Sequence, residues 1–120
     1  MSSSEAEPIT IAIDQTTQVF VRGLAFLGFP LHPAGRPSKD RADHLFKVHI
    51  PMLFLQGTRD ALADLGELKP LCEALGANAT LKLFADADHS FRVPARSGRT
   101  SSQVLDELLD ALASWIAGLG

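Results

Sequence analysis

Three short apolar runs lie in the middle of the chain, and a turn-like segment follows each of them. They cover residues 21–30, 51–57 and 79–84. The first two are almost continuously apolar, which is typical of strands buried on both faces of a parallel sheet. The third alternates leucines with polar residues and predicts another strand. The β-branched stretch "PITIAI", residues 8–13, predicts a further strand near the start of the chain.

Helical patterns follow these runs. Residues 38–46 begin with Ser38, a residue type that caps helices, and predict a short helix. The last segment has a single apolar face, and Thr100 with Gln103 forms the pattern of a capping box in front of it. The pattern predicts a long amphipathic helix that packs on the rest of the molecule.

Residues 65–75 carry apolar side chains at helical spacing, with Asp64 and Gly76 as start and stop signals. Pro70 lies inside this segment, where it removes one backbone hydrogen bond and clashes with the preceding turn. We therefore expect a kink, or a helix that begins only near Lys69.

The alternation of strands and helices predicts an α/β protein with a short, mostly parallel sheet flanked by helices. The chain of 120 residues fits one domain, predicted over residues 8–120 and preceded by a disordered segment, residues 1–7. In "DQTTQ", which follows the first predicted strand, the polar residues indicate a turn.

The composition and net charge of the chain limit the cellular compartment and the kinds of partner that we expect for this protein. The net charge of −3 and the absence of an arginine stripe argue against nucleic-acid binding. No apolar run approaches the roughly 20 residues of a membrane-spanning helix. The start of the chain lacks the pattern of a secretory signal, and the single cysteine, Cys72, excludes an internal disulfide. We expect a cytoplasmic protein without membrane or nucleic-acid partners.

Two predicted strands end in loops that carry ionisable groups. Asp60 lies in "GTRDALAD" after the second run, and His89 lies in "DADHSF" after the third. If these parallel strands are neighbours, about 4.8 Å apart, the two side chains meet above the edge of the sheet. A carboxylate that accepts the Nδ1 proton of a histidine fixes its tautomer and makes Nε2 a general base.

Simpler interpretations compete with that one. Asp60 is also a candidate turn cap or a partner of Arg59, in which case His89 simply ends a strand. Asp86 and Asp88 compete for the role of the acid, although their closeness to His89 in sequence favours a role in shaping its loop.

Three motifs, "LGFPLHPAGRP", "MLFLQGTRDALA" and "ADHSFRVPARSGRT", occur in this order. Residues 21–118 resemble the carboxyl-terminal half of an α/β-hydrolase. More narrowly, they resemble the dienelactone-hydrolase-like branch, which includes the testis-expressed and NSL-complex-subunit-like α/β-hydrolase domain proteins. The resemblance implies a serine–acid–histidine order with Asp60 as the acid and His89 as the histidine. It also implies an ester or other acyl substrate, with three residues as candidate lining of the substrate cleft: His32, Arg59 and Phe91.

The chain departs from that family at the nucleophile. No G-x-S-x-G turn occurs in the sequence. Ser97 follows the histidine without a preceding strand, and Cys72 lies on a helical apolar face, so neither fits the nucleophile position. We interpret residues 8–19 as a remnant of the family's first strand, joined by an internal deletion to the carboxyl-terminal half. The expected protein is a truncated hydrolase that is inactive or incomplete, and the sequence leaves open whether it is an enzyme.

A non-catalytic interaction module is the alternative. In it, the exposed apolar edge of the strand within residues 21–30 supports self-association. A candidate anion site lies before the last helix, where backbone N–H groups favour negative charge. Its residues are Arg96, Ser97 and Arg99. We predict no cofactor, and the spacing of the acidic residues around His89 fits no standard metal site.

Overall fold

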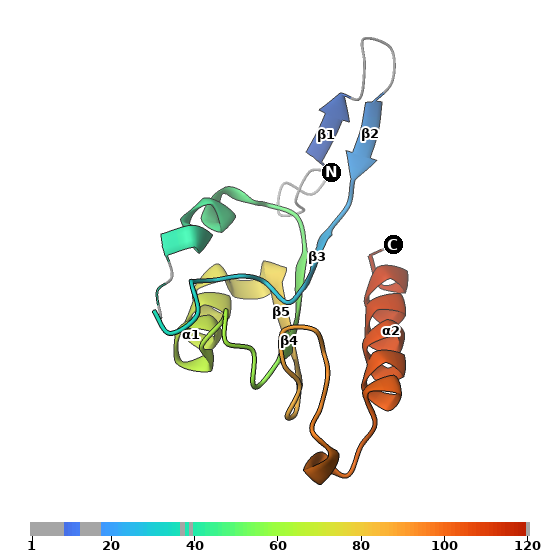
Figure 1. Ribbon diagram of the computed structural model, residues 1–120. Coiled ribbons are helices and arrows are strands. Elements are labelled where there is room, and N and C mark those ends of the chain that lie inside the picture. Colours follow the sequence, from blue (N-terminus) through green and yellow to red (C-terminus); the bar gives the residue numbers. More distant parts are fainter. Residues whose placement is uncertain (1–8, 13–17, 37, 39, 120) are drawn as a thin grey trace.

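Three parallel strands form the sheet at the centre of the molecule (Figure 1). Their order across the sheet is β3 (Leu24–Leu27), β4 (Met52–Gly57) and β5 (Ala79–Phe84). The register aligns the first residues of the strands, so their carboxyl ends lead to the same edge of the sheet. This confirms the predicted α/β class and the predicted neighbourhood of the second and third apolar runs. The computed structural model describes residues 9–12, 18–36, 38 and 40–119.

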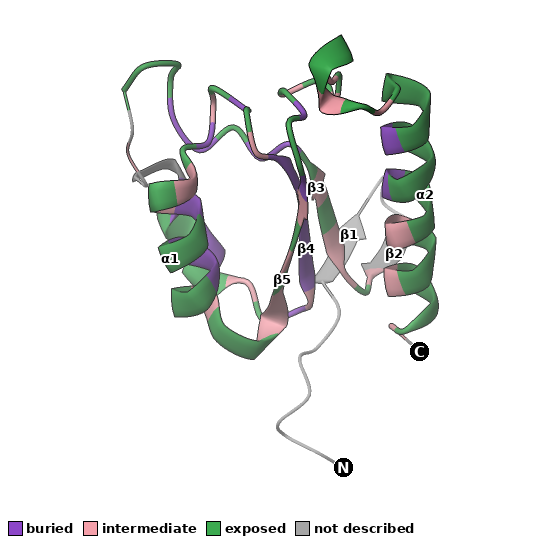
Figure 2. Ribbon diagram, turned by 90° about the horizontal axis from the view of Figure 1, so that it is seen from below, coloured by how far each residue is buried: buried purple, intermediate pink, exposed green. Residues whose placement is uncertain are grey.

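Two hydrophobic clusters lie on opposite faces of this sheet. Helix α1 (Leu65–Leu75) covers one face and helix α2 (Ser101–Ala117) the other, with their buried residues turned towards the strands (Figure 2). Phe54 belongs to the first cluster and Leu55 to the second, because successive strand residues point to opposite faces. All six residues of β4 are buried, as expected for a central strand covered on both sides.

Helix α1 begins at Leu65, so the expected start near Lys69 was wrong. Asp64 caps it by accepting a hydrogen bond from the Gly66 N–H at 2.7 Å. Gly76 ends it with a φ of 78°. A proline inside a helix costs about 3 kcal/mol. The buried leucines of α1 each contribute roughly 1.5–3 kcal/mol, which is enough to hold the helix together through Pro70.

Helix α2 carries the predicted capping box. The Thr100 hydroxyl accepts from the Gln103 N–H, and the Gln103 side chain accepts from the Thr100 N–H. Only part of the predicted apolar face is covered, since Val104 and Leu108 are buried while other apolar side chains of the helix are half-exposed. Helix α2 therefore presents apolar side chains to solvent as well as to the sheet.

The amino-terminal strand prediction needs correction. β1 (Ile9–Ala12) confirms a strand in residues 8–13, but β2 (Gln18–Val21) was missed. The two strands form a separate antiparallel hairpin, apart from the parallel sheet (Figure 1). The run at 21–30 is therefore divided between β2 and β3 at Gly23, where the chain passes so close to α2 that an added Cβ would lie 2.7 Å from Trp115. Residues 1–8 and 13–17, which include the predicted disordered segment and most of the predicted turn, lie outside the described residues.

Three 3₁₀ helices complete the described chain. They are η1 (Asp40–Lys47), η2 (Gly76–Asn78) and η3 (Ala95–Ser97). η1 occupies the segment predicted as a short helix and forms the crossover from β3 to β4. In the part of the chain that the structure describes, no helix is long and apolar enough to cross a membrane.

Candidate acid–base site

The loops after β4 and β5 meet above the carboxyl edge of the sheet. Asp60 lies in the first loop and His89 in the second. The His89 Nδ1 atom is 2.7 Å from the Asp60 Oδ2 atom. The contact expected from the sequence is therefore present, and its catalytic use is a separate question.

The two partners differ in exposure. The Asp60 side chain is fully buried, whereas 41 % of the His89 side chain is exposed. A buried carboxylate needs hydrogen-bond donors. Asp60 receives them from His89 and Gln56 on Oδ2, the latter at 2.6 Å, and from the Leu62 N–H on Oδ1 at 2.8 Å.

Backbone hydrogen bonds join the two loops. The Thr58 N–H donates to the Phe84 carbonyl, and the Arg59 N–H donates to the Ala87 carbonyl. This close approach requires glycine at position 57, because an added Cβ would lie 2.3 Å from the Ala87 carbonyl oxygen. The carboxylate and the imidazole are thus held by a shared, hydrogen-bonded backbone.

The loop that carries His89 is also closed on itself. The Asp88 carboxylate accepts hydrogen bonds from the Ser90 and Arg92 N–H groups at 2.9 and 3.0 Å. The Asp88 N–H donates to the Arg92 carbonyl. Phe91 adopts a φ of 61°, unusual for a side chain of this size. Asp88 therefore shapes the loop, in agreement with the alternative drawn from the sequence.

The geometry defines what His89 can do chemically. With its Nδ1 proton donated to Asp60, the neutral ring carries its lone pair on Nε2. No other described residue forms a hydrogen bond with the His89 ring. Such a ring can accept a proton at Nε2, and the carboxylate then stabilises the imidazolium.

His32 lies in the interior, with only 2 % of its surface exposed. Its Nε2 accepts the Asp64 N–H at 2.7 Å, so its Nδ1 carries the proton and donates to the Pro33 carbonyl at 2.7 Å. Both ring nitrogens are used within the protein. These contacts give His32 a structural role in holding the loop after β3 against the start of α1.

The other candidate cleft residues lie in the two loops that carry the pair. Arg59 is exposed and immediately precedes the acid. Phe91 is half-buried and packs edge-to-face on Phe84, with ring centres 5.7 Å apart. Their part in binding a substrate stays a prediction.

The candidate anion site is occupied largely by contacts within the chain. The Arg99 guanidinium pairs with the Glu107 carboxylate, and the Ser97 hydroxyl accepts the Arg99 N–H at 3.2 Å. Arg96 is exposed. The capping box of α2 already uses the Thr100 and Gln103 N–H groups, and the anion site stays a prediction.

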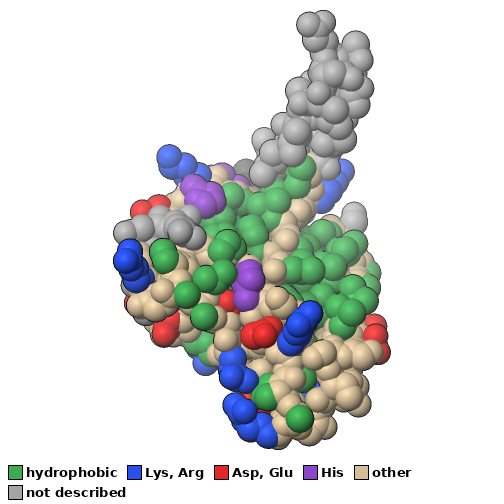
Figure 3. Space-filling model, in the orientation of Figure 1, with side chains coloured by type: hydrophobic (Ala, Val, Ile, Leu, Met, Phe, Trp, Pro, Cys, Tyr) green, Lys and Arg blue, Asp and Glu red, His purple; other side chains and the backbone are tan. Residues whose placement is uncertain are grey.

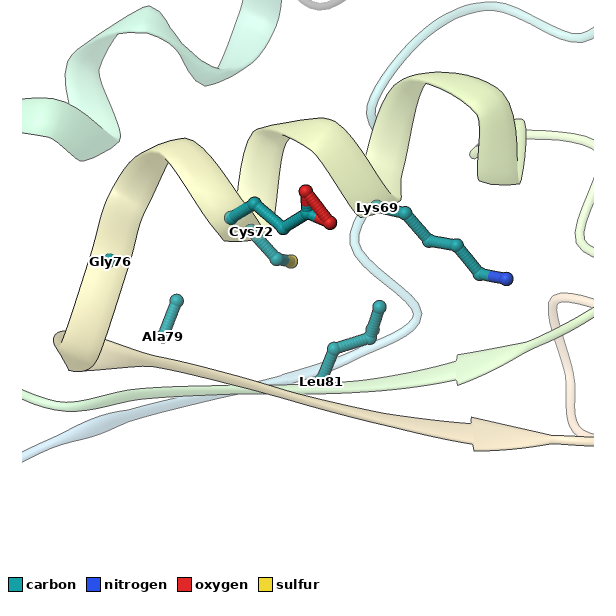
Figure 4. Close-up of a pocket in the computed structure, with 6 residues that line it drawn as sticks. Lys69, Cys72, Gly76, Ala79 and Leu81 are labelled. Carbon is teal, nitrogen blue, oxygen red and sulfur yellow. The ribbon is translucent and has the colours of Figure 1, made fainter.

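Cys72 lies in a groove of about 480 Å³ between α1 and β5 (Figure 4). Its side chain points towards the strand, from which Leu81 points back to the helix (Figure 4). Burial raises the pKa of the Cys72 thiol from 9.0 to about 11, so the thiol is neutral and unreactive near pH 7. Among the described residues, no three histidine, cysteine, aspartate or glutamate side chains are grouped closely enough to hold a metal ion.

Sequence reasoning missed Gln56, Gly57 and Gly28, although each supports the pair. Gln56 is the only polar side chain in the run "MLFLQG", and that exception in a buried strand was the available signal. Gly28 has a φ of 81°, and an added Cβ there would lie 3.1 Å from His89 Nδ1. The corresponding signals were a glycine inside the run at 21–30 for Gly28 and a glycine that ends the run at 51–57 for Gly57.

A small parallel sheet between helices, with a carboxylate–histidine pair at its carboxyl edge, defines an α/β protein of the type that carries hydrolytic centres. Comparison with protein families agrees with this class. The model of the alpha/beta hydrolase domain family matches residues 9–117. The chain belongs to this family.

Proposed function

We propose that Asp60 and His89 form the acid–base part of a serine-hydrolase-type centre that acts on esters or related acyl compounds. One observation carries this proposal. The buried Asp60 carboxylate accepts the His89 Nδ1 proton at 2.7 Å, and 41 % of the His89 side chain remains exposed. Membership of the alpha/beta hydrolase domain family supports the reaction class. The strand-end motifs further favour the dienelactone-hydrolase-like branch.

In the proposed reaction, His89 Nε2 removes the proton of a hydroxyl group as that oxygen bonds to the acyl carbon. The ester C–O bond then breaks, and the proton passes from Nε2 to the leaving alcohol. Asp60 holds the ring orientation and stabilises the imidazolium between these two transfers. Water supplies the hydroxyl that releases the acyl group.

The nucleophilic hydroxyl is the missing part. No G-x-S-x-G turn occurs in the chain, and no described serine bonds to His89. We propose that the chain on its own acts only as a positioned base, which accelerates hydrolysis by roughly 10²–10⁴-fold. A serine-dependent rate would need a hydroxyl that the described residues do not place beside His89.

Hydrolysis of p-nitrophenyl acetate by the purified chain tests the role of the pair. The slow reaction should disappear in His89→Ala and fall strongly in Asp60→Asn. His44→Ala provides a matched control, because His44 is an exposed histidine on η1, in a segment separate from the two loops of the pair. Equal rates in all four proteins would overturn the proposed function.

A fluorophosphonate probe tests the missing nucleophile separately. We expect no labelled residue in the purified chain, since such probes need an activated serine. Labelling that is lost in His89→Ala would contradict this part of the proposal while supporting the base role of His89.

We also propose, as a second function, that the chain self-associates. Four half-exposed side chains, Leu27, Leu105, Leu109 and Ile116, are called the apolar flank here. Leu27 is level with Leu55, which belongs to the cluster beneath α2, so the flank lies on the α2 face of the sheet. Figure 3 shows hydrophobic side chains gathered over α2 and beside the strands. β3 is also an edge strand of the sheet.

A second copy of the chain satisfies both features, since two β3 edges can pair while the flanks cover each other. Sedimentation velocity over a concentration series should show dimers in the unaltered chain. The double variant Leu105→Gln, Leu109→Gln should weaken dimerisation by at least about tenfold. The control is Ser114→Gln, Ala117→Gln, at exposed positions on another side of α2. A monomer at all concentrations would exclude self-association.

We propose a cytoplasmic setting. Cys72 is free and buried, and free thiols persist where cellular reductants keep them reduced.

A further inference from the structure

We propose that Gln56 is a positioning residue that fixes the Asp60 carboxylate relative to His89. Gln56 lies near the end of β4 and is fully buried. A buried amide is costly unless both its donor and its acceptor are satisfied. Its presence in an otherwise apolar strand therefore calls for a specific set of partners.

Both ends of the Gln56 amide are used. Its Oε1 accepts the Phe29 N–H at 3.1 Å, and its Nε2 donates to Asp60 Oδ2 at 2.6 Å. A backbone N–H can only donate, and an ionised carboxylate can only accept. The amide orientation is thus dictated by its partners, and a methionine or an ionised glutamate at this position could not serve both.

These hydrogen bonds prevent the Asp60 carboxylate from rotating. Oδ2 receives Gln56 and His89, and Oδ1 receives the Leu62 N–H. Turning the carboxylate away from His89 would break the bonds from Gln56 and Leu62 as well. Gln56 therefore holds the same oxygen atom that binds the imidazole.

Gln56 also fixes the surface behind the imidazole. Its partner Phe29 follows Gly28, and an added Cβ on Gly28 would lie 3.1 Å from both Cε1 and Nδ1 of His89. One amide thus connects the carboxylate to the backbone that backs the histidine ring. It sets the distance between the two sides of the site, although it touches no substrate.

The test measures the tautomer of His89, which does not depend on turnover. In ¹⁵N-labelled protein at about pH 9, where imidazoles are neutral, the Nδ1–H form should dominate in the unaltered chain. In Gln56→Met the ratio of the Nδ1–H form to the Nε2–H form should fall by about tenfold, the scale of one hydrogen bond to a charged group. Leu55→Val is the control, since it trims a buried side chain of the same strand without a polar contact, and it should keep the original ratio. An unchanged ratio in Gln56→Met would overturn the proposal.

A second measurement uses the unaltered chain and covers the case in which Gln56→Met does not fold. The side-chain amide protons of Gln56 should exchange with solvent at least about tenfold more slowly than those of Gln103, which is exposed. Equal exchange rates would also overturn the proposal.

The catalytic consequence rests on the proposed function and is tested apart from it. The rate of p-nitrophenyl acetate hydrolysis should fall by roughly tenfold in Gln56→Met, with KM unchanged. If hydrolysis does not depend on His89, the proposed function fails, and the tautomer ratio still decides the role of Gln56.

Discussion

Gly28 lies behind the His89 imidazole at the carboxyl end of β3. Its φ of 81° belongs to the left-handed region, and a Cβ added there would lie 3.1 Å from the ring, so the imidazole would have to shift. Two independent requirements, backbone conformation and contact with the imidazole, therefore meet at one position. Gly35 allows the two requirements to be tested apart, because it shares the positive φ but has no atom within 4 Å of an added Cβ.

Gly28→Ala should destabilise the chain and displace the imidazole. The backbone cost is about 1–2 kcal/mol and should also appear in Gly35→Ala, as measured by urea unfolding. Only Gly28→Ala should lower the fraction of His89 in the Nδ1–H form and the rate of ester hydrolysis. If both variants affect His89 equally, the contact between Gly28 and the ring has no influence on the site.

The Cys72 thiol should make stability depend on alkaline pH. Its pKa rises from 9.0 to about 11 on burial, so only the unfolded chain ionises between these values. The unfolded state then binds fewer protons than the folded state, and the free energy of unfolding falls as the pH rises through this window. Urea unfolding from about pH 8 to about pH 11 should show a loss on the order of 1–2 kcal/mol relative to Cys72→Ala, which cannot ionise there. Parallel pH curves for the two proteins would contradict the buried, neutral thiol.

At the scale of elements, tertiary contacts override local signals in α1. Pro70 predicted a kink or a start near Lys69, yet the helix begins at Leu65 and continues through the proline, because its cap at Asp64 and its buried leucines outweigh the missing bond. At the boundary between β2 and β3, the local sequence pattern failed to show where one strand ends. Only Arg22 and Gly23 separate β2 from β3, so a continuous apolar run concealed the end of one strand and the start of another.

Replacement of Pro70 by alanine should stabilise the chain. It restores an N–H that can donate to the Gly66 carbonyl one turn earlier and removes the clash there. We expect a gain of about 1–2 kcal/mol, since proline's smaller unfolded-state entropy offsets part of the roughly 3 kcal/mol cost. Thermal unfolding of Pro70→Ala beside Lys69→Ala measures the effect, and the exposed lysine should change stability by less than about 0.5 kcal/mol. A loss of stability in Pro70→Ala would show that the proline supports the helix.

For the whole molecule, the parallel sheet could be predicted from the sequence. Which apolar side chains of α2 are buried and which are exposed could not. Periodicity identified the strands at residues 52–57 and 79–84, and strand adjacency brought Asp60 to His89 as expected. The role of Gln56 depends on Phe29, which is 27 positions away, so no local pattern reveals it. The apolar face of α2 was also visible in the sequence, but its spacing could not show that part of it is left uncovered.

Amide exchange should rank the strands by their place in the sheet. β4 has a paired neighbour on each side and lies between both hydrophobic clusters. In the monomer, at protein concentrations too low for dimers, its amides should therefore exchange only through global unfolding, whereas those of β3 should exchange through smaller openings. Hydrogen–deuterium exchange followed by mass spectrometry can compare the two strands. Equal protection of both at low concentration would contradict this ranking, whereas the proposed dimer should raise the protection of β3 as the concentration increases.

The closed loop around His89 has an evolutionary consequence. Asp88 ties the backbone of Ser90 and Arg92 within a stretch of five positions, so the hydrogen bonds that close the loop around the histidine are local. Substitutions at the exposed positions of the segments that follow can accumulate while the imidazole stays aligned. A lineage can in this way lose or exchange its nucleophile and still inherit a histidine that is hydrogen-bonded to the acid.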